Sequence, residues 1–264
     1  LQGDAGSDTL LGGDANDTLT GGSEDDLLKG DAGDDTLYGN DGNDTLVGGL
    51  GTNTLLGGSG DDTYDGTDGE ETIDFSGSVL ATVVDLSLST SQTTGEGKDT
   101  LIDIEHLIGS AQNDTLTGSS GNNTIFAGEG NDTLDGGDGA DTLIGGAGND
   151  ILRGGDTGSD TSSDDVVDFS AKTTAMNVDL SIGQATGDGV DTLTGIEHII
   201  GGSGNDTLEG DNLVNSIFGG TGDDTLIGNG GDDTLSGGTG GTNSFIGGSG
   251  DDTFNGSGVK DIAD

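Results

Sequence analysis

The feature that most constrains this chain is a nine-residue period. Residues 136–153 contain two consecutive copies of one pattern, GGDGADTLI and GGAGNDILR, in which Gly-Gly-any-Gly-any-Asp is followed by any residue, an apolar residue and any residue. One apolar residue in nine does not match the 3.6-residue period of an amphipathic helix. It fits short strands separated by glycine turns, because glycine allows positive φ and leaves room for carbonyls to approach a cation. We therefore predict an all-β fold in which two units form one coil and coils stack at about 4.8 Å.

The repeat extends over most of the chain. Its frame runs for eight units from Gly3 to Asp74, for five units from Gly109 to Arg153 and for four units from Gly201 to Ser236; a ten-residue variant and one further unit follow. In the first block the eighth position is always apolar, so these side chains are expected to face inward: Leu10, Leu19, Leu28, Leu37, Leu46, Leu55, Tyr64 and Ile73.

The composition shows why such a chain needs help to fold. Of 264 residues 58 are Gly and 27% are hydrophobic, while 51 acidic residues face five basic ones, for a net charge of −46. Low hydrophobicity with high charge is ordinarily typical of disorder, because too little apolar surface is buried to offset chain entropy. Periodic carboxylates indicate that bound cations supply the missing free energy. The charge argues against nucleic acid and anionic membranes as partners, and no apolar run approaches the roughly 18 residues of a membrane span.

Two similar inserts interrupt the period. Asp168-Phe169-Ser170 repeats Asp74-Phe75-Ser76 94 residues on, and Ile196-Glu197-His198 repeats Ile104-Glu105-His106 92 residues on. We therefore predict three repeat blocks and two β-rich inserts, and expect the segment to be cut from an array that continues in both directions. The expected division is 1–74, 75–108, 109–162, 163–200 and 201–264, the last range including the start of a further repeat.

The pattern resembles the repeats-in-toxin (RTX) nonapeptide, which covers about two-thirds of the chain. The resemblance implies a right-handed parallel β-roll, a calcium-stabilised solenoid holding on the order of ten Ca²⁺ ions between turns two units apart. Their ligands would be backbone carbonyls and the sixth-position aspartates. Carried over by position, these are Asp8, Asp17, Asp26, Asp35, Asp44, Asp62, Asp114, Asp132, Asp141, Asp150, Asp206, Asp224, Asp233 and Asp252.

Some sixth positions depart from the pattern. Asn53, Asn123 and Asn215 offer an amide oxygen without charge, so we expect their turns to bind calcium more weakly or not at all. Three further sites carry a side chain one methylene longer than the family geometry expects: Glu71, Glu105 and Glu197.

The seventh position, between the carboxylate and the apolar residue, should face solvent because side chains alternate along a strand. It carries the two histidines, His106 and His198, which we interpret as outward residues, with a second metal site or a subunit contact as the alternative. Elsewhere it is mostly threonine. The expected outward threonine ladders reflect β-propensity or form a surface for ice or glycan.

These features favour a structural function. We predict a calcium-dependent, secreted module that is unfolded in the low-calcium cytosol and folds at the cell surface after type I export, as part of a surface layer, filament or adhesin stalk. Its expected partners are calcium and copies of itself, end to end or side by side. Two alternatives remain: the secretion and folding region of an enzyme or toxin, and an ice- or glycan-binding adhesin. The sequence contains no cysteine and no recognisable nucleophile context, so we expect no active site.

Overall fold

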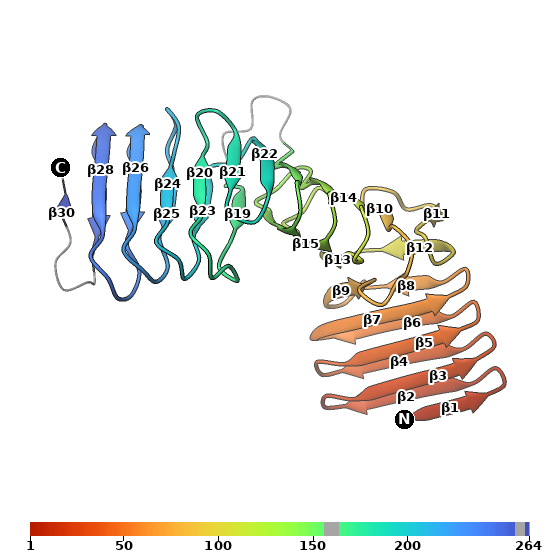
Figure 1. Cartoon of the computed structure of the whole chain (residues 1–264). Coiled ribbons are helices and arrows are strands. Elements are labelled where there is room, and N and C mark those ends of the chain that lie inside the picture. The colour runs from red at the N-terminus through yellow and green to blue at the C-terminus, as the bar shows by residue number, and fades with distance from the viewer. Residues whose placement is uncertain (156–163, 257–261, 264) are drawn as a thin grey trace. The chain divides into compact units, whose positions relative to one another are not determined.

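The computed structural model describes residues 1–155, 164–256 and 262–263, and within these ranges the chain consists of strands, turns and bends without a helix. The chain divides into two compact units, Leu1–Asp132 and Thr133–Asp264. Each unit is a right-handed solenoid of mainly parallel strands (Figure 1). The predicted all-β roll is confirmed. No helix in the described part could cross a membrane. The expected boundary at 162/163 lies outside the described residues, as do 257–261 and 264 at the end of the last predicted block.

In the first unit, alternate nonapeptides contribute to opposite faces. The longer face has the strand order β1 (Gln2–Ala5), β3 (Thr18–Ser23), β5 (Thr36–Asp41), β7 (Thr52–Ser59), β9 (Glu70–Asp74), β13 (His106–Ile108) and β15 (Thr124–Glu129). The other face has the order β2 (Thr9–Asp14), β4 (Leu27–Ala32), β6 (Thr45–Leu50), β8 (Thr63–Asp65), β12 (Lys98–Ile102) and β11 (Gln92–Thr93), with β10 (Val83–Asp85) paired to β14 (Thr115–Thr117).

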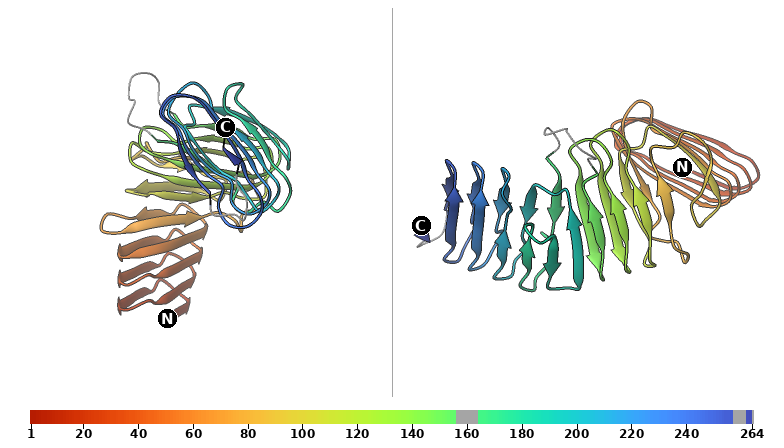
Figure 2. Two further views of the ribbon diagram at one scale, coloured as in Figure 1. Left: turned by 90° about the vertical axis from the view of Figure 1, so that its left-hand side faces the viewer. Right: turned by 90° about the horizontal axis from the view of Figure 1, so that it is seen from above.

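The second unit follows the same plan. One face runs β17 (Thr142–Ala147), β19 (Val166–Asp168), β23 (His198–Ile200), β25 (Ser216–Phe218), β27 (Thr234–Ser236) and β29 (Thr253–Asn255). The other runs β16 (Thr133–Asp135), β18 (Ile151–Arg153), β22 (Val190–Thr194), β21 (Gln184–Thr186), β20 (Asn177–Asp179), β24 (Thr207–Glu209), β26 (Thr225–Gly230), β28 (Ser244–Ser249) and β30 (Ile262–Ala263). The views in Figure 2 show the stacked strands of each unit.

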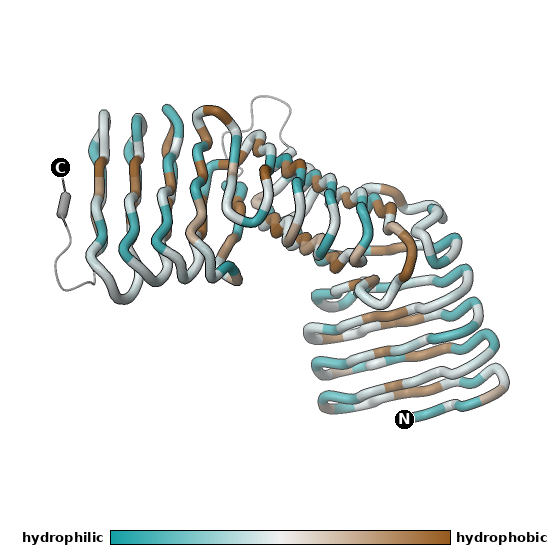
Figure 3. The backbone as a smooth tube through the Cα atoms, in the orientation of Figure 1, coloured by the Kyte–Doolittle hydropathy of each residue, from teal (hydrophilic) through white to brown (hydrophobic). Residues whose placement is uncertain are grey.

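The core of each unit is a ladder of eighth-position side chains. Leu37 pairs in register with Leu19 and Leu55, and all three are fully buried, as are Leu28 and Leu46 on the opposite face. The hydrophobic colour along the strands in Figure 3 follows this ladder. Burying a leucine side chain contributes about 1.5–3 kcal/mol, so one apolar residue in nine still gives each coil two such contributions.

The inserts are wound into the same faces as the nonapeptides. In the second insert the chain leaves β19, runs forward as β20, returns as the antiparallel β21 and then enters β22, which lies in register on β18. In the first insert, β10, β11 and β12 follow the same path, and β12 lies in register on β8. The coil next to each preceding block is therefore closed by two segments that are far apart in sequence. We call this junction the split turn. The first split turn contains Ser78, Glu96 and Asp99, and the second contains Lys172, Asp188 and Asp191.

Candidate calcium-binding turns

The sixth-position side chains form hydrogen-bonded rows along the stacked turns. From the second coil on, a carboxylate oxygen typically accepts the backbone N–H of the sixth residue in the coil before it, as in Asp8 N to Asp26 Oδ1 (2.7 Å) and Asp26 N to Asp44 Oδ1 (2.8 Å). The row continues through Asp62 and reaches Asp99, at 2.8 Å for each step. Of the fourteen predicted ligands, eleven are buried, and the three in terminal coils, Asp8, Asp17 and Asp252, are half-buried.

The second carboxylate oxygen of many of these residues has no hydrogen-bond donor. Within the described ranges, such buried unpaired oxygens are Oδ2 of Asp8, Asp26, Asp35, Asp44, Asp62, Asp224 and Asp233, and Oε2 of Glu71. A buried carboxylate oxygen without a partner is costly, so each of these atoms calls for a cation or a proton.

Burial and neighbouring carboxylates affect the protonation of these groups. Desolvation raises the pKa of Asp62 to about 7, with further contributions from Asp99 and Asp44, against a backbone hydrogen bond that lowers it. Desolvation likewise raises the pKa of Glu71 to about 7, and of Asp191 to about 6. These turns therefore favour either neutral carboxyls or a bound positive charge.

Backbone carbonyls lie beside several of the unpaired oxygens. A Cβ on Gly21, the first residue of its turn, would meet both Asp26 Oδ2 and, at 2.9 Å, the carbonyl oxygen of Gly39 in the next coil. The second and fourth turn residues have positive φ, for example Asn40 (76°) and Gly42 (138°). A Cβ at Gly42 would collide with the carbonyl of Glu24. The glycines thus keep open a small space lined by oxygen atoms.

This donor set fits calcium. Within the described residues, no three His, Asp or Glu side chains converge to hold a metal ion. An ion in these turns would be held by one or two carboxylates together with backbone carbonyls. Hard oxygen ligands in a flexible arrangement are those that Ca²⁺ prefers, while Mg²⁺ demands stricter geometry and transition metals favour nitrogen or sulfur.

The structure adds members to the rows that the sequence pattern missed. Asp99, Asp165 and Asp191 are buried sixth-position residues in coils of the inserts. Asp99 accepts the N–H of Asp62, and Asp191 accepts that of Asp150 at 3.0 Å. A local signal was present, since Gly97-Lys98-Asp99-Thr100-Leu101 and Gly189-Val190-Asp191-Thr192-Leu193 match positions four to eight of the nonapeptide.

The glutamates fill the same rows despite their extra methylene. Glu105 Oε2 accepts the N–H of Glu71 at 2.8 Å, and Glu197 Oε2 accepts that of Asp165 at 3.0 Å. The side-chain amide of Asn53 donates to Glu71 Oε1 (2.8 Å), so the turn of Asn53 presents an N–H group toward a carboxylate. Weaker calcium binding at the turn of Asn53 stays a prediction. This hydrogen bond supports it, because it occupies a carboxylate oxygen that could otherwise bind the ion.

The two turns after each insert are built differently. The second turn residue lacks positive φ there, and its N–H instead donates to the sixth-position side chain: Ser110 to Asp114 Oδ2 (2.6 Å), Ser119 to Asn123 (2.6 Å), Gly202 to Asp206 Oδ2 (2.8 Å) and Asp211 to Asn215 (2.8 Å). We call these four the closed turns. Two predicted ligands, Asp114 and Asp206, lie in closed turns, where protein N–H groups use both carboxylate oxygens.

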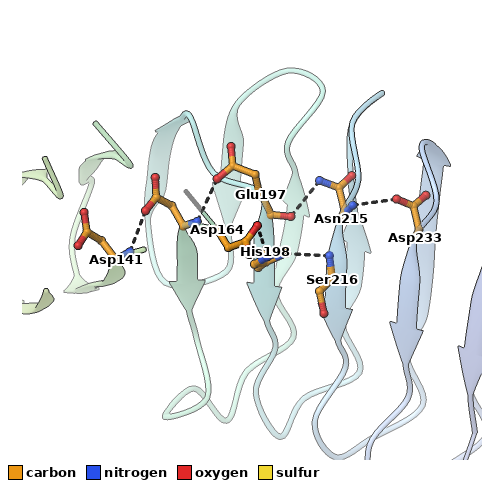
Figure 4. A network of polar contacts seen from close by, with 8 residues as sticks. Asp141, Asp164, Glu197, His198, Asn215, Ser216 and Asp233 are labelled. Atoms are coloured by element: carbon orange, nitrogen blue, oxygen red, sulfur yellow. Dashed lines mark hydrogen bonds and ion pairs between the residues drawn. The ribbon is translucent and has the colours of Figure 1, made fainter. Parts of the chain in front are cut away.

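The histidines belong to the junction between insert and closed turn. His198 Nδ1 accepts the N–H of Ser216 at 2.9 Å, and its Nε2 lies 3.5 Å from Asp164 Oδ1. The amide of Asn215 meanwhile donates to the carbonyl of Glu197 at 2.9 Å (Figure 4). His106 makes the matching bond to Thr124 N at 3.1 Å, while Asn123 donates to the Glu105 carbonyl at 2.8 Å. Each histidine is only half-buried. His198 takes the place of a carbonyl as the acceptor for the next strand, whereas the Thr124 N–H also reaches the Glu105 carbonyl at 3.4 Å.

The threonines of the seventh position form the predicted ladder. Thr18, Thr36, Thr54 and Thr72 pair in register along one face of the first unit. The first is exposed and the other three are half-buried. On the opposite face the ladder is interrupted, because Leu27 lies between Thr9 and Thr45.

Comparison with known proteins agrees with this geometry. The family model described as RTX calcium-binding nonapeptide repeat (4 copies) matches residues 2–37, 20–55, 38–73, 102–134, 126–161, 191–212, 209–241 and 237–258. These matches cover about three quarters of the chain. No curated protein matches the chain.

Proposed function

Because this chain belongs to the RTX calcium-binding nonapeptide repeat family, we propose that it is a calcium-folded structural module of a secreted protein. It would serve as a rigid element of a surface layer, filament or adhesin stalk, with no catalysis of its own. The observation that carries this proposal is the row of buried carboxylate oxygens without a hydrogen-bond donor, several of them beside backbone carbonyls. At neutral pH or above, such a row of charged, buried oxygens is costly unless cations fill it.

Calcium would act as the folding switch. Stacked turns place carboxylates of successive coils side by side, and with a net charge of −46 the repulsion opposes folding in the absence of metal. Bound Ca²⁺ removes this repulsion, and its binding free energy becomes folding free energy. A chain that is unfolded at low calcium and folded at high calcium suits export in the unfolded state followed by folding outside the cell.

The long-range repeat supports an array function. Both inserts form the same split turn and are followed by the same pair of closed turns, so the repeating structural unit is a block of coils plus an insert. The ends of a parallel solenoid are open strand edges, and copies of the module could stack end to end through them.

A calcium titration followed by circular dichroism tests the proposal. We expect an unfolded spectrum in excess chelator, a β-rich spectrum at millimolar Ca²⁺ and full reversal when chelator is added again. Electron microscopy of the folded sample should show assembly into filaments or layers. A β-rich spectrum that persists in excess chelator would contradict the proposal.

A second candidate function is ligand binding through the threonine ladder of β3, β5, β7 and β9. Four threonines in register form a regular hydroxyl row, which suits ice or glycan. A thermal-hysteresis measurement on the calcium-folded protein separates the candidates, because a structural module without this activity should not depress the freezing point.

A further inference from the structure

One lysine in the second unit is held inside the stack of turns. Lys172 follows β19. Its ammonium donates a hydrogen bond to the carbonyl oxygen of Gly146 and forms an ion pair with the carboxylate of Asp188. The side chains of Lys172 and Asp188 are only 17% and 13% exposed. A half-buried lysine whose ammonium contacts a carboxylate and a carbonyl is a structural cation of the fold, not a solvated surface charge.

The ammonium lies within a split turn. Gly146 is the second residue of the turn in the preceding coil, with φ of 96°. Asp188 occupies the third position of the next turn, because Gly189 packs on the carbonyl of Gly148 and Asp191 accepts the N–H of Asp150. Lys172 therefore joins the two separated halves of the split turn and contacts the turn stacked against them.

The first insert has the same backbone without the lysine. Ser78 is the equivalent of Lys172: its N–H donates to the carbonyl of Phe75 at 2.9 Å, as that of Lys172 does to Phe169 at 2.8 Å. Glu96 is the equivalent of Asp188, since Gly97 packs on the carbonyl of Gly60 as Gly189 does on that of Gly148. No lysine or arginine therefore faces Glu96 from the position that Lys172 occupies.

The first split turn also contains unneutralised acidic groups. Asp62, 1% exposed, has an Oδ2 without a hydrogen-bond partner in the described part of the chain. The N–H of Asp62 donates to Asp99 Oδ1 at 2.8 Å, so two carboxylates lie together in this turn, and Glu96 lines an open hollow together with Gly58 and Asp74. In the second split turn the Lys172 ammonium pairs with Asp188, the equivalent of Glu96. The third-position acid of the split turn is therefore paired with a lysine in the second insert and not in the first.

We propose that the Lys172 ammonium is a built-in replacement for calcium at the second split turn, and that the first split turn takes a Ca²⁺ ion at the equivalent place, beside Glu96 and the carbonyl of Gly58. The inference rests on calcium binding by the turns, which is part of the proposed function. Its consequence is an asymmetry between the two inserts. The second split turn is stabilised by the positive charge of Lys172, whereas the first depends on a bound Ca²⁺ ion.

Reciprocal variants of the whole chain test this inference. K172S gives the second insert the serine of the first, and the double variant S78K/E96D gives the first insert the pair of the second. Native mass spectrometry counts the calcium ions in the folded protein, and circular dichroism gives the calcium midpoint of folding. We expect K172S to bind one additional ion and to raise the midpoint at least twofold. S78K/E96D should bind one ion fewer and fold at a lower midpoint.

K98S is the matched control, because Lys98 is exposed in the first split turn and its loss changes the net charge by the same amount. It should leave the ion count unchanged. If K172S only destabilises the protein, with the ion count of the wild type, the inference is overturned. Should K172S fail to fold at any calcium concentration, the ion count of S78K/E96D decides. A wild-type protein that binds no calcium would instead overturn the proposed function itself.

Discussion

At the residue scale, the two oxygens of a sixth-position carboxylate have separate roles. One accepts a backbone N–H and ties its coil to the one before, as Asp224 does for Asp206 at 2.9 Å. The other is buried without a donor in many turns but accepts an N–H in the closed turns. An aspartate at the sixth position therefore either leaves one oxygen available to a cation or uses it to accept a backbone N–H. Which of the two occurs depends on the φ of the second turn residue.

This difference predicts opposite results for two neighbouring aspartates. D224N should remove one bound ion and raise the calcium midpoint, because an amide group replaces the free oxygen and its charge. D206N should leave the number of ions unchanged and cost about 1–3 kcal/mol, because it leaves one N–H of a closed turn without its acceptor. Ion counting by native mass spectrometry together with urea denaturation measures both effects. Equal loss of one ion in both variants would show that the closed turns bind calcium.

The raised carboxyl pKa values predict a pH dependence of the calcium-free protein. Asp62, Glu71 and Asp191 have folded-state pKa values of about 7, 7 and 6, above ordinary values of 3.8 and 4.5. Between these limits the folded state binds more protons than the unfolded state, so folding stability falls as pH rises. In chelator, the chain should have more β-structure at pH 5.5 than at pH 8, by circular dichroism. Equal or greater structure at pH 8 would contradict this expectation.

At the element scale, each coil combines a rigid turn with a short strand. The strand contributes one buried apolar side chain, and the turn contributes oxygen atoms whose spacing depends on positive φ at the fourth position, which Ala15 and Glu24 adopt with a side chain, at 80° and 76°. The φ of 138° at Gly42 lies in a region that is essentially limited to glycine, whereas Asn40, at 76°, adopts a conformation that asparagine tolerates.

G42A should therefore disrupt its turn. Backbone strain of about 1–3 kcal/mol adds to the collision of the new Cβ with the Glu24 carbonyl. We expect a lower urea midpoint in saturating calcium and the loss of one ion. G77A is the control, because a Cβ there would meet nothing within 4 Å. If G42A denatures at the midpoint of G77A, the turn does not require glycine.

At the scale of the whole molecule, the screening of charge by salt and the coordination of an ion by oxygen atoms are two separate contributions to folding. Salt at 0.15 M reduces the Debye length to about 8 Å and weakens repulsion between exposed carboxylates. It does not supply a ligand to the buried oxygens of the turns, and Mg²⁺ dehydrates too reluctantly to be held largely by carbonyls.

We therefore expect neither 0.5 M NaCl nor 5 mM MgCl₂ to fold the chelated chain, whereas millimolar CaCl₂ does. Circular dichroism at constant protein concentration measures this, with a CaCl₂ titration in 0.15 M NaCl as the reference. Complete folding in NaCl alone would mean that charge screening, not coordination, limits folding.

The nine-residue period by itself determined the strand-and-turn unit, the inward eighth position and the sixth-position row, because each follows from local spacing in a parallel stack. It did not reveal that Asp99 and Asp191 continue these rows. In a solenoid the neighbour of a residue is set by the coil on which it stacks, and the inserts bring that neighbour from 37 or 41 positions away instead of 18. The backbone conformation that separates closed turns from open ones, and the placement of the Lys172 ammonium between two turns, were likewise decided only by tertiary structure, since both depend on contacts between successive coils.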